Sequence, residues 1–554
     1  MKKPPSRAAH ARKGKIMGRA INTHQTMFEY VRDGSGDFPD SKTVIFFKGR
    51  EISKKRLFED SGKFCAYLCS LGIKKGDVVT IHLPNLPSAT AAFYAVNKLG
   101  AIANLVHPLM PPLPLSAMTR DAGSKLLLTF EGYFAQNGAA LDPGCPVVTA
   151  AASDYLPPLV AGIYRRAKER TFEGVKSWRS MMKEFKPHEG APVGGGEDVA
   201  VLMHSGGTTG KPKAIELQNR AFNELTECLT YVIKDYDGNR DVSLMVLPIF
   251  HGFGLGVCMH SMLSRGIESV MVPKYSTKEV LSLVKKRGVT IIAGVPLMYK
   301  KMLSGGAAFA AMKGVRHIFC GGDKLTSALK KQFDGELKKV GSSACLLEGY
   351  GQTECVTVCC VNEPGEYIKG CMGKPLHGIK IACCDGEKIL PAGETGELIV
   401  SAPTLMKGYR GADNSRVFLN IGGEKWLRTG DSGRVDEEGR VFFNDRIKAA
   451  EKVSGVVVYP QEICEVAGDV PDVAESYALK VSSGEREFMR LYCALEKGAD
   501  EEKARREIMR ACEQKLIVYA RPREIIFMDR LPRTAVGKVD AGKLRQLAFE
   551  KSGK

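Results

Sequence analysis

The sequence predicts an α/β fold, and three observations support this class. Short apolar stretches alternate with charged segments of helical spacing, as in residues 277–288 (TKEVLSLVKKRG), which precede 289–296 (VTIIAGVP). The second of these stretches has the length of a buried strand and ends in Gly and Pro, which interrupt regular structure. Chemically distinctive loops begin where such strands end. Since open α/β sheets bind ligands outside the carboxyl ends of their strands, we expect the functional groups on these loops.

Further strands follow the same pattern along the chain. Residues 199–203 (VAVLM) are apolar and lead directly into the polar run 204–213 (HSGGTTGKPK). Residues 317–322 (HIFCGG) and 344–351 (ACLLEGYG) are predicted to be buried strands that end at a motif. Gly430 to Asp445 has the pattern of a hairpin, and new αβ material with a different charge balance follows it. A second domain is therefore predicted to begin near Asp445.

Composition indicates an ordinary globular protein of 554 residues, 44% hydrophobic and 26% charged, long enough for two or more domains. No apolar run is long enough to span a bilayer and no secretory signal is evident, so we expect a cytoplasmic protein. The 16 cysteines are scattered and show no CxxC spacing, so we interpret them as reduced, mostly buried thiols. A metal cluster around Cys355, Cys359 and Cys360 is the alternative.

The formal net charge is +18. Residues 1–28 contain basic side chains and no acidic one: Lys2, Lys3, Arg7, Arg12, Lys13, Lys15 and Arg19. We predict that this segment is a disordered basic arm, with a solvated tail favoured over contact with anionic lipid or nucleic acid. A transit peptide is a further alternative. The remaining positive charge suits polyanionic ligands, which it would attract.

The run 204–213 has the composition of a phosphate-binding loop. Its glycines allow close backbone approach, its hydroxyl groups add donors and its lysines add charge: Gly206, Gly207, Gly210, Ser205, Thr208, Thr209, Lys211 and Lys213. It is not a Walker A loop, because only three residues separate Gly206 from Gly210 and Pro212 follows Lys211. A flexible surface loop is the competing interpretation.

The stretch SGGTTGKPK resembles the signature of the adenylate-forming superfamily, which comprises acyl-CoA synthetases, luciferases and the adenylation domains of peptide synthetases. Further motifs follow in that family's order: LPIFHGFGLG at 247–256, EGYGQTE at 348–354, RTGD at 428–431, DRIK at 445–448 and LPRTAVGK at 531–538. The resemblance covers most of the chain. It implies that the protein uses ATP to convert a carboxylate into an acyl adenylate.

The resemblance also sharpens the expected architecture. It implies a large N-terminal domain at 29–445, with βα sheets and a barrel-like subdomain, that binds ATP and the acid. A small, mobile α+β domain at 446–554 would follow, turning on a hinge at Lys448.

Roles for single residues are implied by the same motifs. Lys538 would bridge the acid and the α-phosphate during adenylation, and Glu354 would bind Mg²⁺ beside Thr353, which would contact phosphate. Tyr350 would stack on adenine, while Asp431 and Arg446 would bind the ribose hydroxyls. The strand-end glycines Gly321, Gly322 and Gly351 complete the expected nucleotide site.

The acyl and thiol sites are implied as well. His251 would position the carboxylate near the thiol's entry path, next to acyl-binding positions Gly294, Gly321 and Cys355. The segment 452–464 (KVSGVVVYPQEIC) resembles acyl-CoA synthetases, with Ser454 and Gly455 beside the pantetheine arm of CoA. ATP and CoA are thus the expected co-substrates and Mg²⁺ the expected cofactor.

The acid-binding residues are small and uncharged, which favours a hydrophobic carboxylic acid such as a medium- or long-chain fatty acid. Aryl and sterol-like acids stay open, as does an acyl-AMP ligase that loads a separate carrier protein. A nucleic-acid or membrane binding protein with an inactive enzyme fold is disfavoured, because polar groups are present at all of these motifs. Residues 154–170 resemble an insertion in bacterial fatty acyl-CoA synthetases and are interpreted either as a peripheral membrane contact or as a plain covering helix. No nucleic-acid partner is expected.

Overall fold

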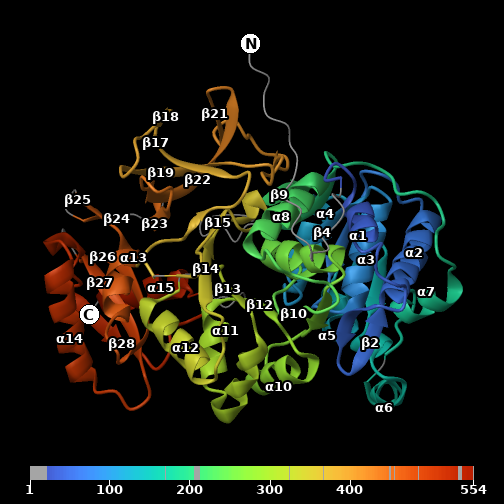
Figure 1. Ribbon diagram of the computed structural model, residues 1–554, viewed down its shortest axis with the longest axis horizontal. Coiled ribbons are helices and arrows are strands. Elements are labelled where there is room, and N and C mark those ends of the chain that lie inside the picture. The colour runs from blue at the N-terminus through green and yellow to red at the C-terminus, as the bar shows by residue number, and fades with distance from the viewer. Residues whose placement is uncertain are drawn as a thin grey trace, which may run out of the picture.

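The computed structural model describes residues 22–552, except 169, 205–212, 324, 366, 448–450, 454–455, 484–485 and 534–538. Within these residues the strands form three large sheets and two small ones. Figure 1 shows two helix-covered sheets side by side, a third sheet above them and the C-terminal elements at one end. The expected class, α/β with a barrel-like subdomain and a small C-terminal α+β part, is confirmed.

The first sheet has the order β20-β9-β8-β4-β3-β5-β6-β7, with parallel pairing from β8 to β7. Its strands are β3 (Val78–His82), β4 (Ile102–Leu105), β5 (Ser124–Phe130), β6 (Val147–Ala150), β7 (Lys176–Ser177), β8 (Val199–His204), β9 (Ala214–Gln218) and β20 (Gly408–Tyr409). The polar run that begins at His204 therefore connects two neighbouring antiparallel strands, β8 and β9.

The second sheet has the order β16-β15-β14-β13-β12-β10-β11-β1-β2, parallel from β14 to β1. Its strands are β1 (Thr43–Phe47), β2 (Arg50–Ser53), β10 (Val242–Met245), β11 (Glu268–Met271), β12 (Ile291–Gly294), β13 (His317–Cys320), β14 (Leu346–Tyr350), β15 (Cys360–Val361) and β16 (Lys374–Pro375). β12, β13 and β14 confirm the predicted strands at 289–296, 317–322 and 344–351.

Helices cover these sheets: α1 (Met27–Gly34), α2 (Lys54–Ser70), α3 (Pro87–Lys98), α4 (Pro112–Asp121), α5 (Glu131–Asn137), α6 (Pro158–Lys168), α7 (Trp178–Glu184), α8 (Asn219–Val232), α9 (Met262–Ser264), α10 (Thr277–Arg287), α11 (Pro296–Leu303) and α12 (Ser327–Lys339). α10 is the helix predicted at 277–288, and it ends because Gly288 adopts φ 62°. α3 is buried along its whole length, including its polar residues Ser88, Thr90, Asn97 and Lys98. None of the helices within the described residues combines the length and the apolar character that a membrane crossing requires.

The start of the described chain packs against α8. Thr26 caps α1 by accepting a hydrogen bond from the Glu29 amide, and Met27 is fully buried. The Asn223 side chain donates hydrogen bonds to the carbonyl oxygens of Thr23 and Gln25. Residues 22–28, which the sequence placed at the end of the basic arm, are thus part of the fold, while 1–21 lie outside the described residues.

The third sheet is antiparallel, with the order β18-β17-β19-β22-β21 and β23 paired with β22. Its strands are β17 (Lys380–Asp385), β18 (Lys388–Ile389), β19 (Thr395–Ser401), β21 (Phe418–Ile421), β22 (Glu424–Val435) and β23 (Val441–Arg446). β22 and β23 form the hairpin that the sequence predicts, and their register sets Asp431 opposite Arg446.

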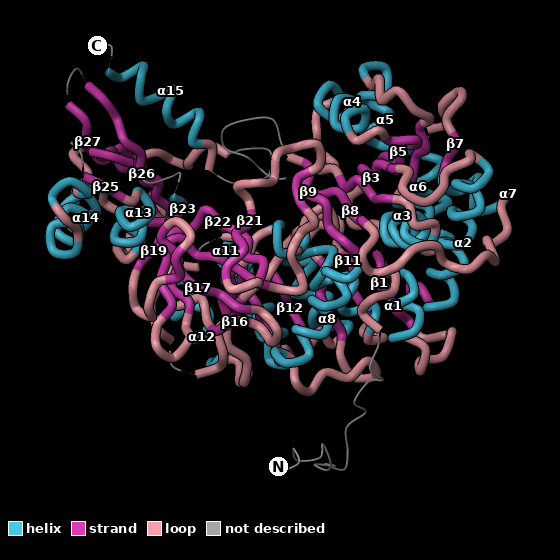
Figure 2. The backbone as a smooth tube through the Cα atoms, turned by 90° about the horizontal axis from the view of Figure 1, so that it is seen from above, coloured by secondary structure: helices cyan, strands magenta, loops and turns pink. Residues whose placement is uncertain are grey.

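The C-terminal elements form their own cores, around Ile463 and Leu491 and around Leu479 and Leu544. They are β24 (Glu451–Val453), β25 (Val456–Val458), β26 (Val473–Ser483), β27 (Arg486–Leu495), β28 (Glu524–Phe527), α13 (Pro460–Gly468), α14 (Glu501–Lys515) and α15 (Ala541–Ser552). In Figure 2 β25, β26, β27, α13 and α14 lie at the left, next to β19 and β23, and α15 lies above them. The domain boundary near Asp445 and the hinge at Lys448 stay predictions, the latter outside the described residues.

Candidate active site

A tyrosine, an aspartate and an arginine meet where β14 reaches the β22–β23 hairpin. The Tyr350 hydroxyl group donates a hydrogen bond of 2.6 Å to Asp431 Oδ2, and Arg446 Nε lies 3.0 Å from Asp431 Oδ1. Asp431 is held locally because its amide donates to Thr429 Oγ1 at 3.0 Å. The three side chains come from positions 350, 431 and 446, which the sequence had marked separately, and the structure brings them together.

The aspartate of this group is buried, with 1% of its surface exposed. Burial raises its pKa, while the charge of Arg446 and the Tyr350 hydrogen bond act in the opposite direction. Asp431 Oδ1 pairs with the charge of Arg446, but that contact lacks the geometry of a hydrogen bond, and no other residue that the structure describes donates one to this oxygen. A buried acceptor left in this state suits a hydroxyl donor from a ligand, so the residues present fit a ribose.

A second polar group surrounds Glu354, directly after β14. The Tyr409 hydroxyl group donates a hydrogen bond of 2.8 Å to Glu354 Oε1, and Lys213 Nζ lies 4.7 Å from the centre of the Tyr409 ring. Tyr409 belongs to β20, which pairs with β9 through Ile215. The far end of the polar run is therefore tied to Glu354. Mg²⁺ is usually held by one or two carboxylates together with phosphate oxygens and water, so the oriented carboxylate of Glu354 fits that ion, while the charge of Lys213 suits the phosphate.

The loop after Glu354 has an unusual backbone. Val356 adopts φ 64° and ψ −57°, and the Thr357 amide donates to the Cys355 carbonyl oxygen at 2.8 Å. This tight turn is strained for a β-branched residue. It is enclosed by glycines, since a Cβ on Gly252 would overlap the Val356 carbonyl oxygen and one on Gly351 would overlap that of Thr357.

The four acyl-binding candidates lie in one neighbourhood. His251 precedes Gly252, which touches the turn at Val356 next to buried Cys355. The Gly321 amide donates to the Gly294 carbonyl oxygen at 3.1 Å. Phe253, two residues after His251, has the side chain nearest to the position that a Cβ on Gly321 would occupy. The expectation that these loops share one site therefore agrees with the arrangement, although their roles stay predictions.

His251 itself is exposed and belongs to an aromatic row. Its ring centre lies 5.1 Å from that of Phe250, which lies 4.6 Å from His107. The segment after it, Phe253–Ser261, is a π-helix whose glycines pack closely: a Cβ on Gly254 would overlap the Pro248 carbonyl oxygen. Wide helices of this kind are frequent at functional sites.

Gly322, which the sequence also assigned to the nucleotide site, follows Gly321 with φ 79°. The predicted residues outside the described part of the chain are Ser205, Gly206, Gly207, Thr208, Thr209, Gly210, Lys211, Lys448, Ser454, Gly455 and Lys538.

All sixteen cysteines lie within the described residues, and each is a free thiol there. Cys355, Cys359 and Cys360 are buried, as expected. Hydrogen bonding to Cys359, together with burial, raises the pKa of the Cys355 thiol. Those three residues do not form a metal-binding group in the described part of the chain, where such a group gathers instead around Cys65.

Sequence reasoning missed three residues near the motifs. Tyr409 carries no motif of its own, and only the strand-like spacing of LMKGYR before the β22 hairpin hinted at it. Gln352 Nε2 is buried without a partner among the described residues, inside the EGYGQTE motif. His204 ends β8, and its Nε2 lies 2.7 Å from Asn104 Oδ1 in a polar row that continues to Thr80.

Known proteins resemble this chain over most of its length. The AMP-binding enzyme model matches residues 32–410, and the model for the C-terminal domain of AMP-binding enzymes matches 462–538. A long-chain-fatty-acid–CoA ligase of Bacillus subtilis is 29% identical, covering 93% of both chains. The 4-coumarate–CoA ligase 1 of Oryza sativa subsp. japonica is 27% identical, covering 86% of this chain and 83% of the relative.

Solved structures share the fold. The anthranilate CoA ligase AuaEII in complex with anthranoyl-AMP superimposes with a TM-score of 0.82 at 23% identity, covering 96% of this chain and 99% of the other. ATP-bound MatB from Rhodopseudomonas palustris gives 0.81 at 23% identity, covering 95% and 99%.

Proposed function

This chain belongs to the AMP-binding enzyme family, and on that premise we propose that it joins a medium- or long-chain fatty acid to CoA. It is an AMP-forming acid–CoA ligase that uses ATP. The observation that carries the proposal of a hydrophobic acid is the composition of the loops that contain the acyl-binding candidates. Gly294, Val295, Cys320 and Cys355 are small or apolar and carry no charge.

The reaction has two steps. In the first, a carboxylate oxygen of the acid bonds to the α-phosphorus of ATP while the bond to pyrophosphate breaks. In the second, the CoA sulfur bonds to the acyl carbon, AMP leaves, and the thiol proton passes to solvent. Because two anions meet in the first step, oriented cations and hydrogen-bond donors are the main requirement.

The roles of the chain's residues follow from that requirement. Asp431 and Arg446 hold the ribose, with the Tyr350 ring against adenine. Lys213 and the loop 205–211 hold the phosphates, and Thr353 donates to them. Glu354 would hold Mg²⁺, which would neutralise charge on the phosphate oxygens.

The remaining roles concern the acid and the thiol. Lys538 bridges the carboxylate and the α-phosphate. His251 orients the acid, and Ser454 with Gly455 line the path of the pantetheine arm after the C-terminal part turns at Lys448. The tie of Asp431 to both Tyr350 and Arg446 supports the nucleotide half of this assignment.

Two relatives bear on the acid. The Bacillus relative named as a long-chain fatty acid ligase aligns over most of both chains, which supports a fatty acid. The rice relative named for 4-coumarate keeps an aryl acid as the second candidate. We further propose the cytoplasm as the compartment, since the scattered spacing of the cysteines in the sequence suits reduced thiols.

The decisive experiment is a substrate series with CoA-dependent AMP release as the readout. We expect kcat/KM to rise about fourfold per methylene group, from about 0.8 kcal/mol per buried CH₂, along straight-chain acids from acetate until the pocket is full. Benzoate, cinnamate and a bile acid complete the panel. A maximum at acetate or a preference for an amino acid contradicts the proposal, and adenylation without transfer to free CoA indicates a carrier-protein acceptor instead.

A peripheral membrane contact is the second part of the proposal, carried by α6. Leu159 and Ile163 are 85% and 71% exposed, and Arg165 and Arg166 follow on the same short helix. Such a helix suits an anionic lipid surface. Cosedimentation with phosphatidylserine vesicles that is unchanged in Leu159→Glu/Ile163→Glu excludes this contact.

A further inference from the structure

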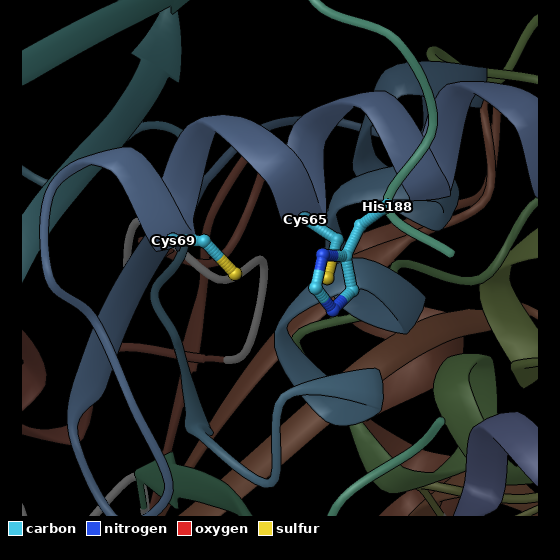
Figure 3. A group of neighbouring side chains, drawn as sticks. All are labelled: Cys65, Cys69 and His188. Carbon is cyan, nitrogen blue, oxygen red and sulfur yellow. The ribbon is translucent and has the colours of Figure 1, made fainter. Parts of the chain in front are cut away.

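Three side chains that commonly bind metal ions meet on helix α2, away from the candidate active site. Cys65 and Cys69 lie one turn apart on that helix, and His188 comes from the segment between α7 and β8. Their ligand atoms all lie within 4.8 Å of one another. Figure 3 shows the Cys69 sulfur pointing toward Cys65 and the His188 ring.

The backbone holds this arrangement from both sides. The His188 amide donates to the Gly62 carbonyl oxygen at 2.9 Å, and Lys98 Nζ donates to the His188 carbonyl oxygen at 2.6 Å. Gly62 allows the close approach, because a Cβ there would lie 2.9 Å from Pro187 Cβ. The histidine ring is thus anchored beside the face of α2 that carries both sulfurs.

A disulfide does not explain the cysteine pair. α2 is continuous from Lys54 to Ser70, and residues four apart on a regular helix have Cβ atoms about 5–6 Å apart. A disulfide needs Cβ atoms about 3.5–4.5 Å apart, so the bond cannot close without distorting the helix. An ion with bonds of about 2.3 Å to sulfur can bridge the wider gap.

The donor set selects the ion. Two thiolates and one imidazole are soft and borderline ligands, which bind zinc-class ions and not the oxygen-preferring Mg²⁺ or Ca²⁺. Cys65 is buried, His188 is half-buried and Cys69 is exposed, so the group opens to solvent on one side. We propose that Cys65, Cys69 and His188 bind one Zn²⁺ ion, with water as the fourth ligand.

Such an ion would join α2 to the segment that leads into β8. The amide of Val193 in that segment donates to the carbonyl oxygen of Lys98, at the end of α3, at 2.9 Å. The segment is thus already held against α3, and the ion would add a side-chain link to α2. The bound ion would therefore link α2 to the segment between α7 and β8. Since none of its ligands belongs to the candidate active site, its loss should change thermal stability more than kcat.

The test uses the full-length protein, reduced, freed of metal by a chelator and kept free of CoA, which itself binds zinc. Titration with Co²⁺ should give thiolate-to-cobalt charge-transfer absorption that saturates at one ion per chain and disappears when Zn²⁺ is added. Zn²⁺ should also slow alkylation of the exposed Cys69, followed by peptide mass spectrometry, by about tenfold or more.

Matched variants separate this site from other thiols. Cys69→Ser and His188→Gln, neither at a fully buried position, should remove the absorption and the zinc-dependent rise in melting temperature, and Cys65→Ala should do the same. Cys145→Ser and Cys345→Ser, at half-buried cysteines elsewhere, should retain both. Undiminished cobalt absorption in Cys69→Ser or His188→Gln overturns the proposal. So does a Cys65–Cys69 disulfide found in the air-exposed protein, or the absence of binding.

Discussion

The Tyr409 hydroxyl group donates a hydrogen bond of 2.8 Å to Glu354 Oε1, while the Tyr409 ring carries the Lys213 ammonium group 4.7 Å from its centre. One side chain thus connects the strand that follows the polar run to the carboxylate assigned to Mg²⁺. Burial raises the pKa of Tyr409, so its hydroxyl group stays protonated and available as a donor.

Tyr409→Phe should therefore weaken adenylation through Glu354 alone, because Phe keeps the ring under Lys213. A hydrogen bond to a charged group contributes about 1.5–3 kcal/mol, so we expect a fall of about tenfold or more in kcat/KM for ATP, with a higher Mg²⁺ requirement. ATP–pyrophosphate exchange across Mg²⁺ concentrations measures this. Tyr519→Phe, at a half-exposed tyrosine of the C-terminal part, is the control. An unchanged Mg²⁺ profile contradicts the role assigned to Tyr409.

Asp431→Asn tests the ribose site. The amide keeps an oxygen for the Tyr350 hydroxyl group but removes the charge that faces Arg446. We expect kcat/KM for ATP to fall about tenfold to a hundredfold, equivalent to about 1.5–3 kcal/mol, with KM for the acid little changed. Asp436→Asn is the matched control, since Asp436 pairs with Arg440 in the turn of the same hairpin. Equal losses in both variants would indicate damage to the hairpin rather than loss of a ribose contact.

The sequence marked the candidate residues that lie in short motifs, and their roles stay predictions. Asp431, Arg446 and Glu354 each stand in a recognisable string, and the structure places them near one another. Tyr409 could not be predicted in the same way, because its partner Glu354 lies 55 positions away and the link depends on the pairing of β20 with β9. The group of Cys65, Cys69 and His188 could not be predicted from the sequence for a similar reason. The spacing between Cys65 and Cys69 is not a known metal-binding motif, and His188 comes near them only in the folded chain.

Gly351→Ala tests the tight turn at Val356. The added Cβ would overlap the Thr357 carbonyl oxygen, so either β14 or the turn must move. Overpacking of this kind costs about 1–3 kcal/mol, and we expect the free energy of unfolding to fall by that amount together with adenylation activity. Gly335→Ala in α12, where a Cβ meets nothing within 4 Å, should instead stabilise by about 0.5–1 kcal/mol. Urea titration of both variants measures the contrast, and equal stabilities would refute the steric role of Gly351.

His204 predicts a pH dependence of stability. Burial lowers its pKa to about 4 from the ordinary 6.5. The unfolded chain therefore binds a proton near pH 6.5 that the folded chain does not bind until about pH 4. Because the unfolded state holds more protons in this window, the free energy of unfolding falls as the pH drops through it, by about 1.4 kcal/mol per pH unit for one histidine.

His204→Gln should reduce that slope by one proton, since the glutamine amide can still donate to Asn104 Oδ1 but does not titrate. Urea unfolding at intervals between pH 4 and 6.5 gives the slope. His24→Gln, at an exposed histidine, is the control for the substitution itself. If the free energy of unfolding depends on pH with the same slope in His204→Gln and in the unsubstituted protein, protonation of His204 does not contribute to the pH dependence of stability.

Lys538 divides the two half-reactions, if the C-terminal part turns between them as proposed. Lys538→Ala should abolish most acid-dependent ATP–pyrophosphate exchange, because no other cation is assigned to the meeting of the carboxylate and the α-phosphate. Thioester formation from preformed acyl-AMP should stay largely intact, since the turn carries Lys538 away before CoA attacks. Gly455→Trp should give the reverse pattern, as its side chain would fill the pantetheine path. The two assays are run on the same preparations, so a misfolded variant fails both. Equal loss of adenylation and of thioester formation in a folded Lys538→Ala protein contradicts this assignment, because Lys538 would then act in both steps.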